Sequence, residues 1–525
     1  MKHFRILPLL IFFFLSGVSS PEVLQASDNR IPSMGYLQLA IPDSDNQINF
    51  YDFGQNPAGL QADQKFRWMR MYINAQNDWG RYRRLYDPEE ERDYSLVFEG
   101  VKAINSKETF WGSVTYLGDY PHAVYRSLEK HAYEKNFILT DTTTGNYWYN
   151  GPIIKAIYSR KLPLNFSLGL AFNYKVQMGL KNVYTKVESI QREIFPGIGL
   201  CWGVHEKARS FARITKTSPT HTDKNHSENS DLKYGAGIFV YPYDNKTRLT
   251  AVKEMQDAMV YRQIGIRIQF KQVKSTYVRE YRTRGVVLGG QAFYSFSKAL
   301  KIAFSHRYGA VGINTTDNLF VKRGFEQQIQ NTSVGRMVFH KNGLQISAQA
   351  SREALDDWSK TIEYGCLYGE DSQRRLTAGI GLGIDRKWLP ITTGIEFYYG
   401  RFQRTYRDYL LHKTVKNTQP EWELRTGLEI PLFSDAWYVR LGGNWAQQVP
   451  DIFYLYKREK FWGVTTGLSW QTPGFRISFM GAFHSRTPNG SAFKINQPLF
   501  YSLRYIPVGR RRQFTFQIIL QLFEK

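Results

Sequence analysis

Hydrophobic and polar residues alternate with a period of two along many segments of this chain. Successive side chains of a β-strand point to opposite faces, so each such segment predicts a strand with one apolar face. Residues 436–448 give the clearest case, with two tryptophans eight positions apart on the apolar face. Eight residues span about 26 Å along a strand, or about 20 Å along a membrane normal at a tilt near 40°. The two rings are therefore spaced to mark both interfaces of one hydrocarbon layer. The apolar face consists of Trp437, Val439, Leu441, Gly443 and Trp445, and the other face of Tyr438, Arg440, Gly442, Asn444 and Ala446.

One face is lipid-like in every repeat of this pattern, whereas the other mixes glycine with charged and amide side chains. Such strands predict an all-β fold, a closed antiparallel transmembrane β-barrel with a polar lumen, because an open sheet edge in lipid would leave backbone groups unpaired. The segments give about 21 strand candidates, and an odd number conflicts with both chain ends lying at the periplasmic rim. We therefore predict an even number near 20, within a range of 16–22. The alternation is interrupted in 232–285 and ambiguous in 359–370. It is clear in 166–178, 344–351, 376–385, 421–430, 462–471, 475–484 and 514–522.

Short and long connections alternate between the predicted strands. Tight periplasmic turns and longer extracellular loops are typical of outer-membrane barrels. Asn342-Gly343 is a strong hairpin signal, because both residue types accept a positive φ. The predicted short turns are 160–164, 205–208, 297–299, 341–343, 387–390, 433–436 and 472–474, and the predicted long loops are 119–149, 217–230, 311–331, 405–419 and 449–458.

The N-terminal residues have the pattern of a secretory signal peptide. Lys2, His3 and Arg5 precede an apolar run over 6–15, so residues 1–26 are expected to be the signal peptide. Residues 27–64 are expected to form a periplasmic or plug segment, and 65–525 the barrel. The chain after the signal peptide contains no apolar run near 18 residues, which argues against transmembrane helices.

Composition supports a membrane-embedded barrel. Phe, Tyr and Trp make up 15% of the residues, which fits aromatic girdles at two interfaces. The formal net charge of +23 would suggest nucleic acid in a cytosolic protein, but an exported chain does not meet it. Two alternatives stay open for these cations: contact with anionic outer-leaflet lipids, or a solvated surface. Cys201 and Cys366 are expected to be free thiols.

Residues with catalytic or metal-binding chemistry are sparse. Ser305-His306 and His484-Ser485 are sequence neighbours, which point to opposite faces of a strand and form no nucleophile–base pair by themselves. A polar loop carries His221, Asp223, His226 and Glu228, but nothing fixes their geometry. We expect no catalytic residues, no metal, no cofactor and no enzyme activity.

Charged residues on the predicted inward phase are the candidate site. A buried charge needs a partner or water. The set either forms a salt-bridged network that braces the lumen, which we favour slightly because the signs are mixed, or lines a selective pore. The lumen-lining candidates are Lys175, Arg307, Asp385, Glu396, Glu423, Arg425, Glu429 and Arg440.

One short motif precedes the first predicted strand. Pro57 fixes its own φ and keeps its predecessor out of the helical region, which predicts a compact turn. The motif, Asn56, Pro57, Ala58, Gly59 and Leu60, resembles one in the outer-membrane long-chain fatty-acid transporter family and in related barrels used in secretion and surface attachment. The layout is also similar to uncharacterised outer-membrane barrel families. The resemblance implies that residues before the motif, 32–53, form a plug inside the barrel.

The leading functional hypothesis is an outer-membrane barrel that passes a small, hydrophobic molecule passively. The alternative is a non-transporting barrel that serves as a surface scaffold or as the partner of a secretion machine. A membrane-embedded lipase-like enzyme would need a Ser/His pair that the strands do not supply. The expected partners are the bilayer, its anionic outer-leaflet lipids and a solute, with no nucleic acid.

Overall fold

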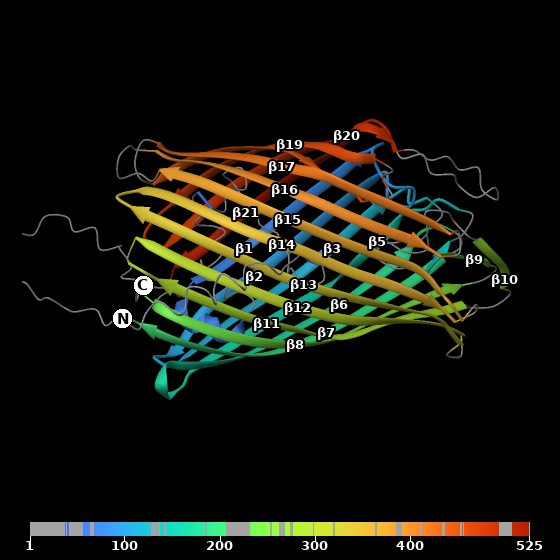
Figure 1. The fold of residues 1–525 in the computed structure, drawn as a ribbon, viewed down its shortest axis with the longest axis horizontal. Coiled ribbons are helices and arrows are strands. Elements are labelled where there is room, and N and C mark those ends of the chain that lie inside the picture. The colour runs from blue at the N-terminus through green and yellow to red at the C-terminus, as the bar shows by residue number, and fades with distance from the viewer. Residues whose placement is uncertain are drawn as a thin grey trace, which may run out of the picture.

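Eighteen strands form one closed antiparallel barrel in the computed structural model of the chain (Figure 1). The first strand pairs with both the second and the last strand, which closes the barrel and leaves no edge in the ring. The number of strands is even and within the predicted range, below its central value of 20. The structure describes residues 37, 39–40, 56–63, 68–125, 127, 133, 137–140, 143–183, 186–205, 232–252, 255–261, 268–273, 277–297, 299–318, 321–362, 365–384, 391–409, 412–432, 436–451, 454, 456–492 and 507–523.

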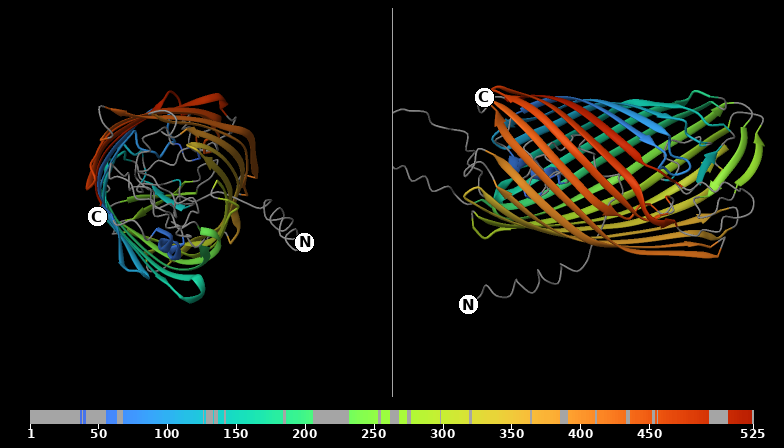
Figure 2. Two further views of the ribbon diagram at one scale, coloured as in Figure 1. Left: turned by 90° about the vertical axis from the view of Figure 1, so that its left-hand side faces the viewer. Right: turned by 90° about the horizontal axis from the view of Figure 1, so that it is seen from above.

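Each barrel strand pairs with its neighbours along the chain, so the topology is a simple meander (Figure 2). The barrel strands are β1 (Trp68–Gly80), β2 (Glu90–Asn105), β3 (Glu108–His122), β5 (Tyr147–Lys161), β6 (Phe166–Lys181), β7 (Lys186–His205), β8 (Leu232–Val252), β11 (Tyr277–Ser295), β12 (Leu300–Asp317), β13 (Val321–Lys341), β14 (Leu344–Thr361), β15 (Leu367–Ile384), β16 (Thr392–Asp408), β17 (Lys413–Leu432), β18 (Trp437–Gln448), β19 (Tyr456–Gln471), β20 (Phe475–Ala492) and β21 (Arg511–Phe523).

Three further strands lie outside the barrel sheet. β4 (Phe137–Thr140), β9 (Met255–Tyr261) and β10 (Ile268–Val273) form a small separate sheet. It lies beyond the barrel end opposite the chain's C-terminus (Figure 1). The interrupted stretch 232–285 contains two of these strands, which explains why an alternation count exceeded the number of barrel strands. Two 3₁₀ helices, η2 (Pro57–Asp63) and η4 (Pro163–Asn165), complete the described elements.

Tight turns gather at the rim where β21 ends. Asn342 and Gly343 have φ of 53° and 83° and join β13 to β14 directly, which confirms the predicted hairpin. Residues 162–165 and 472–474 also join neighbouring strands at this rim. Following the rule for outer-membrane barrels, we call it the periplasmic rim and the opposite one the extracellular rim.

Two predicted long loops are wrong. In 311–331, β12 continues to Asp317 and β13 begins at Val321; in 405–419, β16 continues to Asp408 and β17 begins at Lys413. The strand ends in 405–419 are largely polar on both faces, and the apolar residues of 321–331 are four positions apart at Val321, Phe325 and Ile329, so no continuous period-two alternation marks either stretch. β7 and β8 pair directly in the barrel wall. Residues 206–231 lie outside the described residues, as do those of the predicted 387–390 turn.

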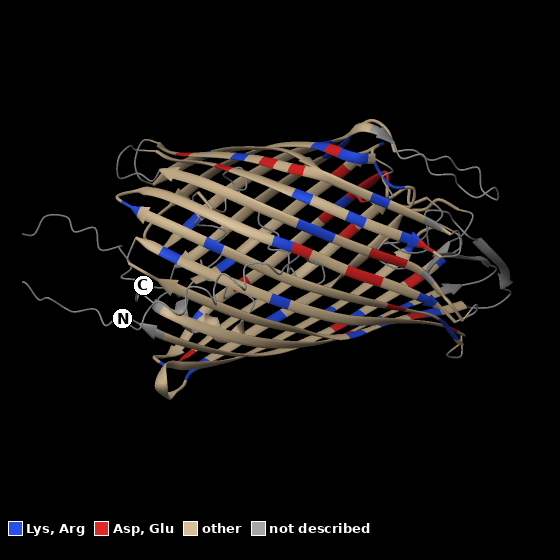
Figure 3. Cartoon of the chain, in the orientation of Figure 1, with Lys and Arg blue, Asp and Glu red and all other residues tan. Residues whose placement is uncertain are grey.

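Side-chain burial alternates along the barrel strands. On β18, Trp437, Leu441 and Trp445 are 39%, 48% and 45% exposed, whereas Arg440 is 2% exposed. The exposed face is apolar and the buried face carries charge. The apolar side chains therefore face lipid and the charged ones face the lumen, as the alternation predicts. Charged residues concentrate toward the extracellular half (Figure 3). Among the described residues no helix is long and apolar enough to cross a bilayer. An even-numbered, closed antiparallel barrel with an apolar outer face is the architecture of the bacterial outer membrane, where this chain belongs.

Candidate functional site: the inner wall and the N-terminal segment

Ion pairs line the inner wall over β14 to β18. Arg440 contacts Glu429 at 2.6 Å, and Arg425 contacts Glu423 at 2.8 Å and Glu396 at 3.9 Å. Closer to the extracellular rim, Arg375 bridges Glu353 and Glu421, both at 2.8 Å. Each carboxylate within this set has an opposite charge beside it, which offsets the desolvation of both partners.

The other candidates lie on different parts of the wall. Arg307 is buried on the inward face of β12. Lys175 on β6 stands opposite Glu193 on β7 in the strand register. Asp385 lies outside the described residues. The structure therefore gathers five of the eight candidates, Glu396, Glu423, Arg425, Glu429 and Arg440, on β16 to β18 and leaves Lys175 and Arg307 apart.

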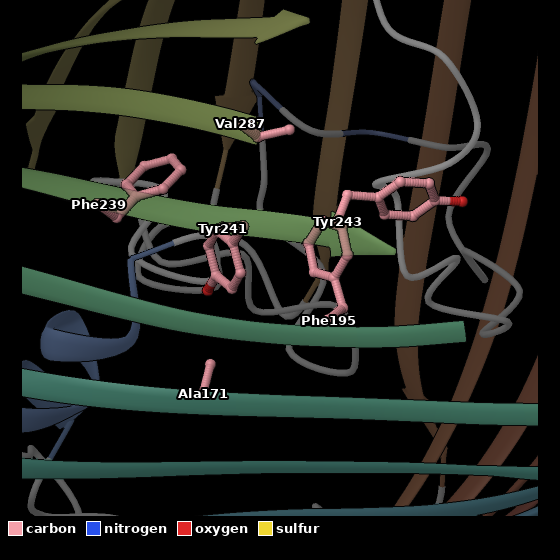
Figure 4. Packing of buried hydrophobic residues seen from close by; sticks show 6 residues of the cluster. All are labelled: Ala171, Phe195, Phe239, Tyr241, Tyr243 and Val287. Atoms are coloured by element: carbon pink, nitrogen blue, oxygen red, sulfur yellow. The ribbon is translucent and has the colours of Figure 1, made fainter. Parts of the chain in front are cut away.

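An aromatic patch covers the inner wall across the lumen from these ion pairs. It consists of Phe195 on β7, Phe239, Tyr241 and Tyr243 on β8, with Val287 on β11 and Ala171 on β6 (Figure 4). The Phe195 ring stacks on Tyr241, with centroids 5.3 Å apart, and meets Tyr243 edge-on at 5.2 Å. The inner wall is thus amphipathic, with an apolar patch over β6 to β11, whose rings lie on β7 and β8, and paired charges on β14 to β18.

The motif of residues 56–60 lies inside the barrel, against β5 to β8. Asn56 is fully buried, and its side-chain N–H₂ donates to the carbonyl oxygen of Ile238 at 3.3 Å. The same side chain accepts from the Ala58 N–H at 3.1 Å, and the Asn56 carbonyl accepts from the Gly59 N–H at 2.9 Å. The predicted compact turn is present, and it continues into η2. Ser159 on β5 donates to the Ala58 carbonyl at 3.1 Å.

Three inward glycines make room for this motif. A Cβ at Gly199 would lie 2.1 Å from the Asn56 side-chain oxygen, and one at Gly237 would lie 2.6 Å from its nitrogen. A Cβ at Gly169 would lie 2.1 Å from the Ala58 backbone nitrogen. We call these three residues the glycine saddle. Any larger side chain at these positions would push the motif off the wall.

A second contact ties the N-terminal segment to the charged wall. The Glu396 carboxylate accepts the backbone N–H groups of Leu39, at 2.5 Å, and Ala40, at 2.8 Å. Gln345 and Ser347 on β14 both donate to the Leu39 carbonyl at 2.5 Å. Glycines again permit the approach, because a Cβ at Gly394 would lie 2.9 Å from that of Ala40. Residues 39–40 and 56–63 therefore bind nearly opposite walls.

At the extracellular rim, three connections meet around Arg84. Its guanidinium binds both Asp87 carboxylate oxygens, stacks over the Tyr133 ring at 4.2 Å and lies 3.8 Å from Asp451. The adjacent carboxylates raise the pKa of Arg84 despite its burial. Burial raises the pKa of Tyr454, in the same cluster, to about 12. Arginine and tyrosines thus hold segments 81–89 and 449–455 together over the mouth.

Residues considered for chemistry form no catalytic set among those described. His306 does not meet Ser305; its Nδ1 lies 2.7 Å from the Ser333 hydroxyl on the lipid-facing side of β13. His484 stacks on Phe461. Both cysteines are free. The loop with His221 and His226 is outside the described residues. The carboxylates of Glu91, Asp93 and Asp119 lie within 4.8 Å of one another, close enough to share a cation.

Sequence reasoning missed the aromatic patch and the docking role of Glu396. In 239–243 every second residue is aromatic, a signal that indicates one continuous aromatic face but not that this face points inward. The Leu39–Glu396 contact joins residues 357 positions apart. No local pattern encodes such a pair.

Comparisons with known proteins give structural likeness alone. No protein-family model and no curated protein matches this chain. Among solved structures, the ferric preacinetobactin receptor BauA of Acinetobacter baumannii has a TM-score of 0.40 at 8% identity, covering 86% of this chain and 80% of its own. A FadL homologue of Pseudomonas aeruginosa has a TM-score of 0.33 at 12% identity, covering 97% and 99%. The monoaromatic hydrocarbon channel CymD has a TM-score of 0.31 at 10% identity, covering 94% and 96%.

Proposed function

We propose that this barrel passes a small, hydrophobic molecule across the outer membrane, with residues 27–64 as a plug that spans its lumen. The observation that carries the proposal is the attachment of the N-terminal segment to two walls, at Glu396 and at the glycine saddle. A segment held on nearly opposite sides crosses the lumen, so a solute must pass it or displace it.

The wall chemistry supports an apolar solute. Aromatic rings offer large apolar area, and the stacked and edge-on rings of the aromatic patch form such a surface inside the barrel. The ion pairs across the lumen are already compensated, so they favour no net charge in the solute. Bracing of a wide barrel and passage of an apolar solute are therefore compatible roles for the two halves of the wall.

The test is a flux measurement on the full chain and on a variant that lacks residues 28–53. This deletion keeps the motif and its saddle but removes Leu39 and Ala40. We expect the deletion to raise both planar-bilayer conductance and entry of an apolar dye into vesicles. Silence of both proteins in both assays would contradict transport. Capture of one stoichiometric protein partner by the long loops, with both proteins silent, would favour the scaffold alternative.

A further inference from the structure

Arginines follow directly after the lipid-facing apolar residues of β21. Its exposed face carries Leu522, Phe516 and Phe514, which are 39%, 40% and 46% exposed. The next residues of this face toward the extracellular rim are Arg512 and Arg510, both exposed. Between them Arg511 points inward and binds Asp78 at 2.8 Å, so the alternation holds to the end of the strand.

Arg510 and Arg512 lie at the depth of the lipid head groups. From 522 to 514 the apolar face covers eight residues, about 26 Å of strand and about 20 Å along the normal at a tilt near 40°. This length fits the apolar band of one outer membrane, which ends at the extracellular interface. Arg512 therefore lies where the phosphates of outer-leaflet lipids begin. Trp79 on β1 is its register neighbour and has the aromatic chemistry of an interface residue.

Several other arginines on the outer face of this rim contact carboxylates. Arg282 and Arg284 share Asp244, at 3.0 and 3.4 Å. The same arrangement is found for Arg374 with Asp356 at 2.8 Å, Arg407 with Glu370 at 2.9 Å and Arg92 with Glu90 at 2.8 Å.

Arg510 and Arg512 differ from these, since neither has a carboxylate partner within the described part of the chain. The register places Trp79 between Arg512 and Glu90, an outward carboxylate that is bonded to Arg92. Among the described residues, the positive charge at the end of β21 is thus uncompensated. Guanidinium groups bind phosphate oxygens in a bidentate manner, which suits a phosphorylated head group.

We propose that Arg510 and Arg512 form a binding site for the phosphate groups of an outer-leaflet glycolipid. The lipid's acyl chains would lie along the Phe514–Leu522 face, and its phosphates would contact the two guanidinium groups. The site concerns the outer surface and is independent of what passes through the lumen.

The test compares two double variants of the full chain with equal charge change. Arg510→Gln/Arg512→Gln removes the proposed site, and Arg282→Gln/Arg284→Gln removes two arginines of the same rim that already contact Asp244. The probe is fluorescent phosphorylated lipid A, titrated into detergent-solubilised barrel. We expect the first variant to bind at least roughly tenfold more weakly, because each cation near an anionic lipid surface contributes about a factor of five. The second should change less than about twofold.

Four further measurements accompany this comparison. Resistance of the folded band to SDS shows that both variants are intact. Arg510→Lys/Arg512→Lys keeps the charge but not the bidentate fork, so it should bind more tightly than the first variant and more weakly than the parent. Lipid A without its phosphates should bind the parent and the first variant alike. Equal weakening in both double variants, or unchanged binding in the first, would overturn the proposal. Competition by millimolar inorganic phosphate as strong as by the lipid would assign the site to free phosphate instead.

Discussion

The side-chain oxygen of Asn56 lies 2.1 Å from the point that a Cβ on Gly199 would occupy. Asn56 belongs to the N-terminal segment and Gly199 to the middle of β7, so this contact fixes the segment to the inner wall. Because the neighbouring atoms are a buried turn, the clash of a side chain at 199 could be relieved only by moving the motif. A substitution at Gly199 is therefore expected to displace the N-terminal segment while the barrel's hydrogen-bond ladder stays intact.

Gly199→Ala should loosen the motif and raise bilayer conductance while the barrel still folds. Overpacking typically costs about 1–3 kcal/mol, which an N-terminal segment relieves by leaving the wall. The matched control is Gly309→Ala, also on the inner wall, where the nearest atom to a new Cβ lies 3.6 Å away. Conductance should rise in the first variant alone. An equal rise in both would mean that the saddle does not hold the segment.

Leu441→Arg should destabilise the barrel by about 2–4 kcal/mol, the cost of a cation at mid-bilayer depth on the lipid face. Leu441 is 48% exposed and lies midway between Trp437 and Trp445. Urea titration of the variant refolded in lipid vesicles measures the loss. Stability equal to that of the parent would contradict the assignment of Leu441 to the lipid-facing side of β18.

Arg440→Leu should also destabilise, because it leaves Glu429 on the inner wall without the guanidinium 2.6 Å away. Breaking a buried pair from one side typically costs about 3–5 kcal/mol. Adding Glu429→Gln should recover much of the loss. The same urea titration tests this, and a double variant no more stable than the single one would show that the pair is not the cause.

Arg84→Ala should loosen the loop cluster at the extracellular mouth with little effect on the barrel. The substitution removes the bidentate contact to Asp87 and the stacking over Tyr133. Arg84→Lys should not restore the cluster, since an ammonium lacks the planar fork. Amide hydrogen exchange of 81–89 reports the change. Faster exchange there, with β1 and β2 unchanged, is the expected result; unchanged exchange at 81–89 would contradict it.

Orientation is checked by labelling single cysteines on whole cells, in a background with Cys201→Ser and Cys366→Ser. Lys322→Cys at the start of β13 should react with an impermeant thiol reagent. Leu164→Cys, in the η4 turn and 82% exposed, should not. The reverse labelling would exchange the two rims and place Arg510 and Arg512 at the inner leaflet.

The local alternation of apolar and polar residues predicts the wall of this barrel, but it does not predict which segments lie inside the lumen. Leu441, Arg440 and the Asn342-Gly343 turn follow from period-two alternation and turn chemistry, which act over a few residues. The strand ends at 311–331 and 405–419 resemble loops in the sequence because their apolar residues do not follow a continuous period-two alternation. Glu396 could be assigned an inward position from alternation. Its role as acceptor for Leu39 could not, because the partner approaches through backbone N–H groups that leave no side-chain signature.

We propose that the solute displaces the N-terminal segment from the wall rather than passing beside it, and a reversible cross-link tests this central claim most directly. In the cysteine-free background, Ala40→Cys and Gly394→Cys place two Cβ atoms 2.9 Å apart, closer than the 3.5–4.5 Å of a disulfide, so the segment must move slightly away from the wall for the bond to form. Vesicles containing this variant would be assayed for apolar dye entry before and after reduction. The account predicts low flux when oxidised and restored flux when reduced, with neither single-cysteine variant responding. Equal flux in the oxidised and reduced states, with the disulfide verified, would contradict it.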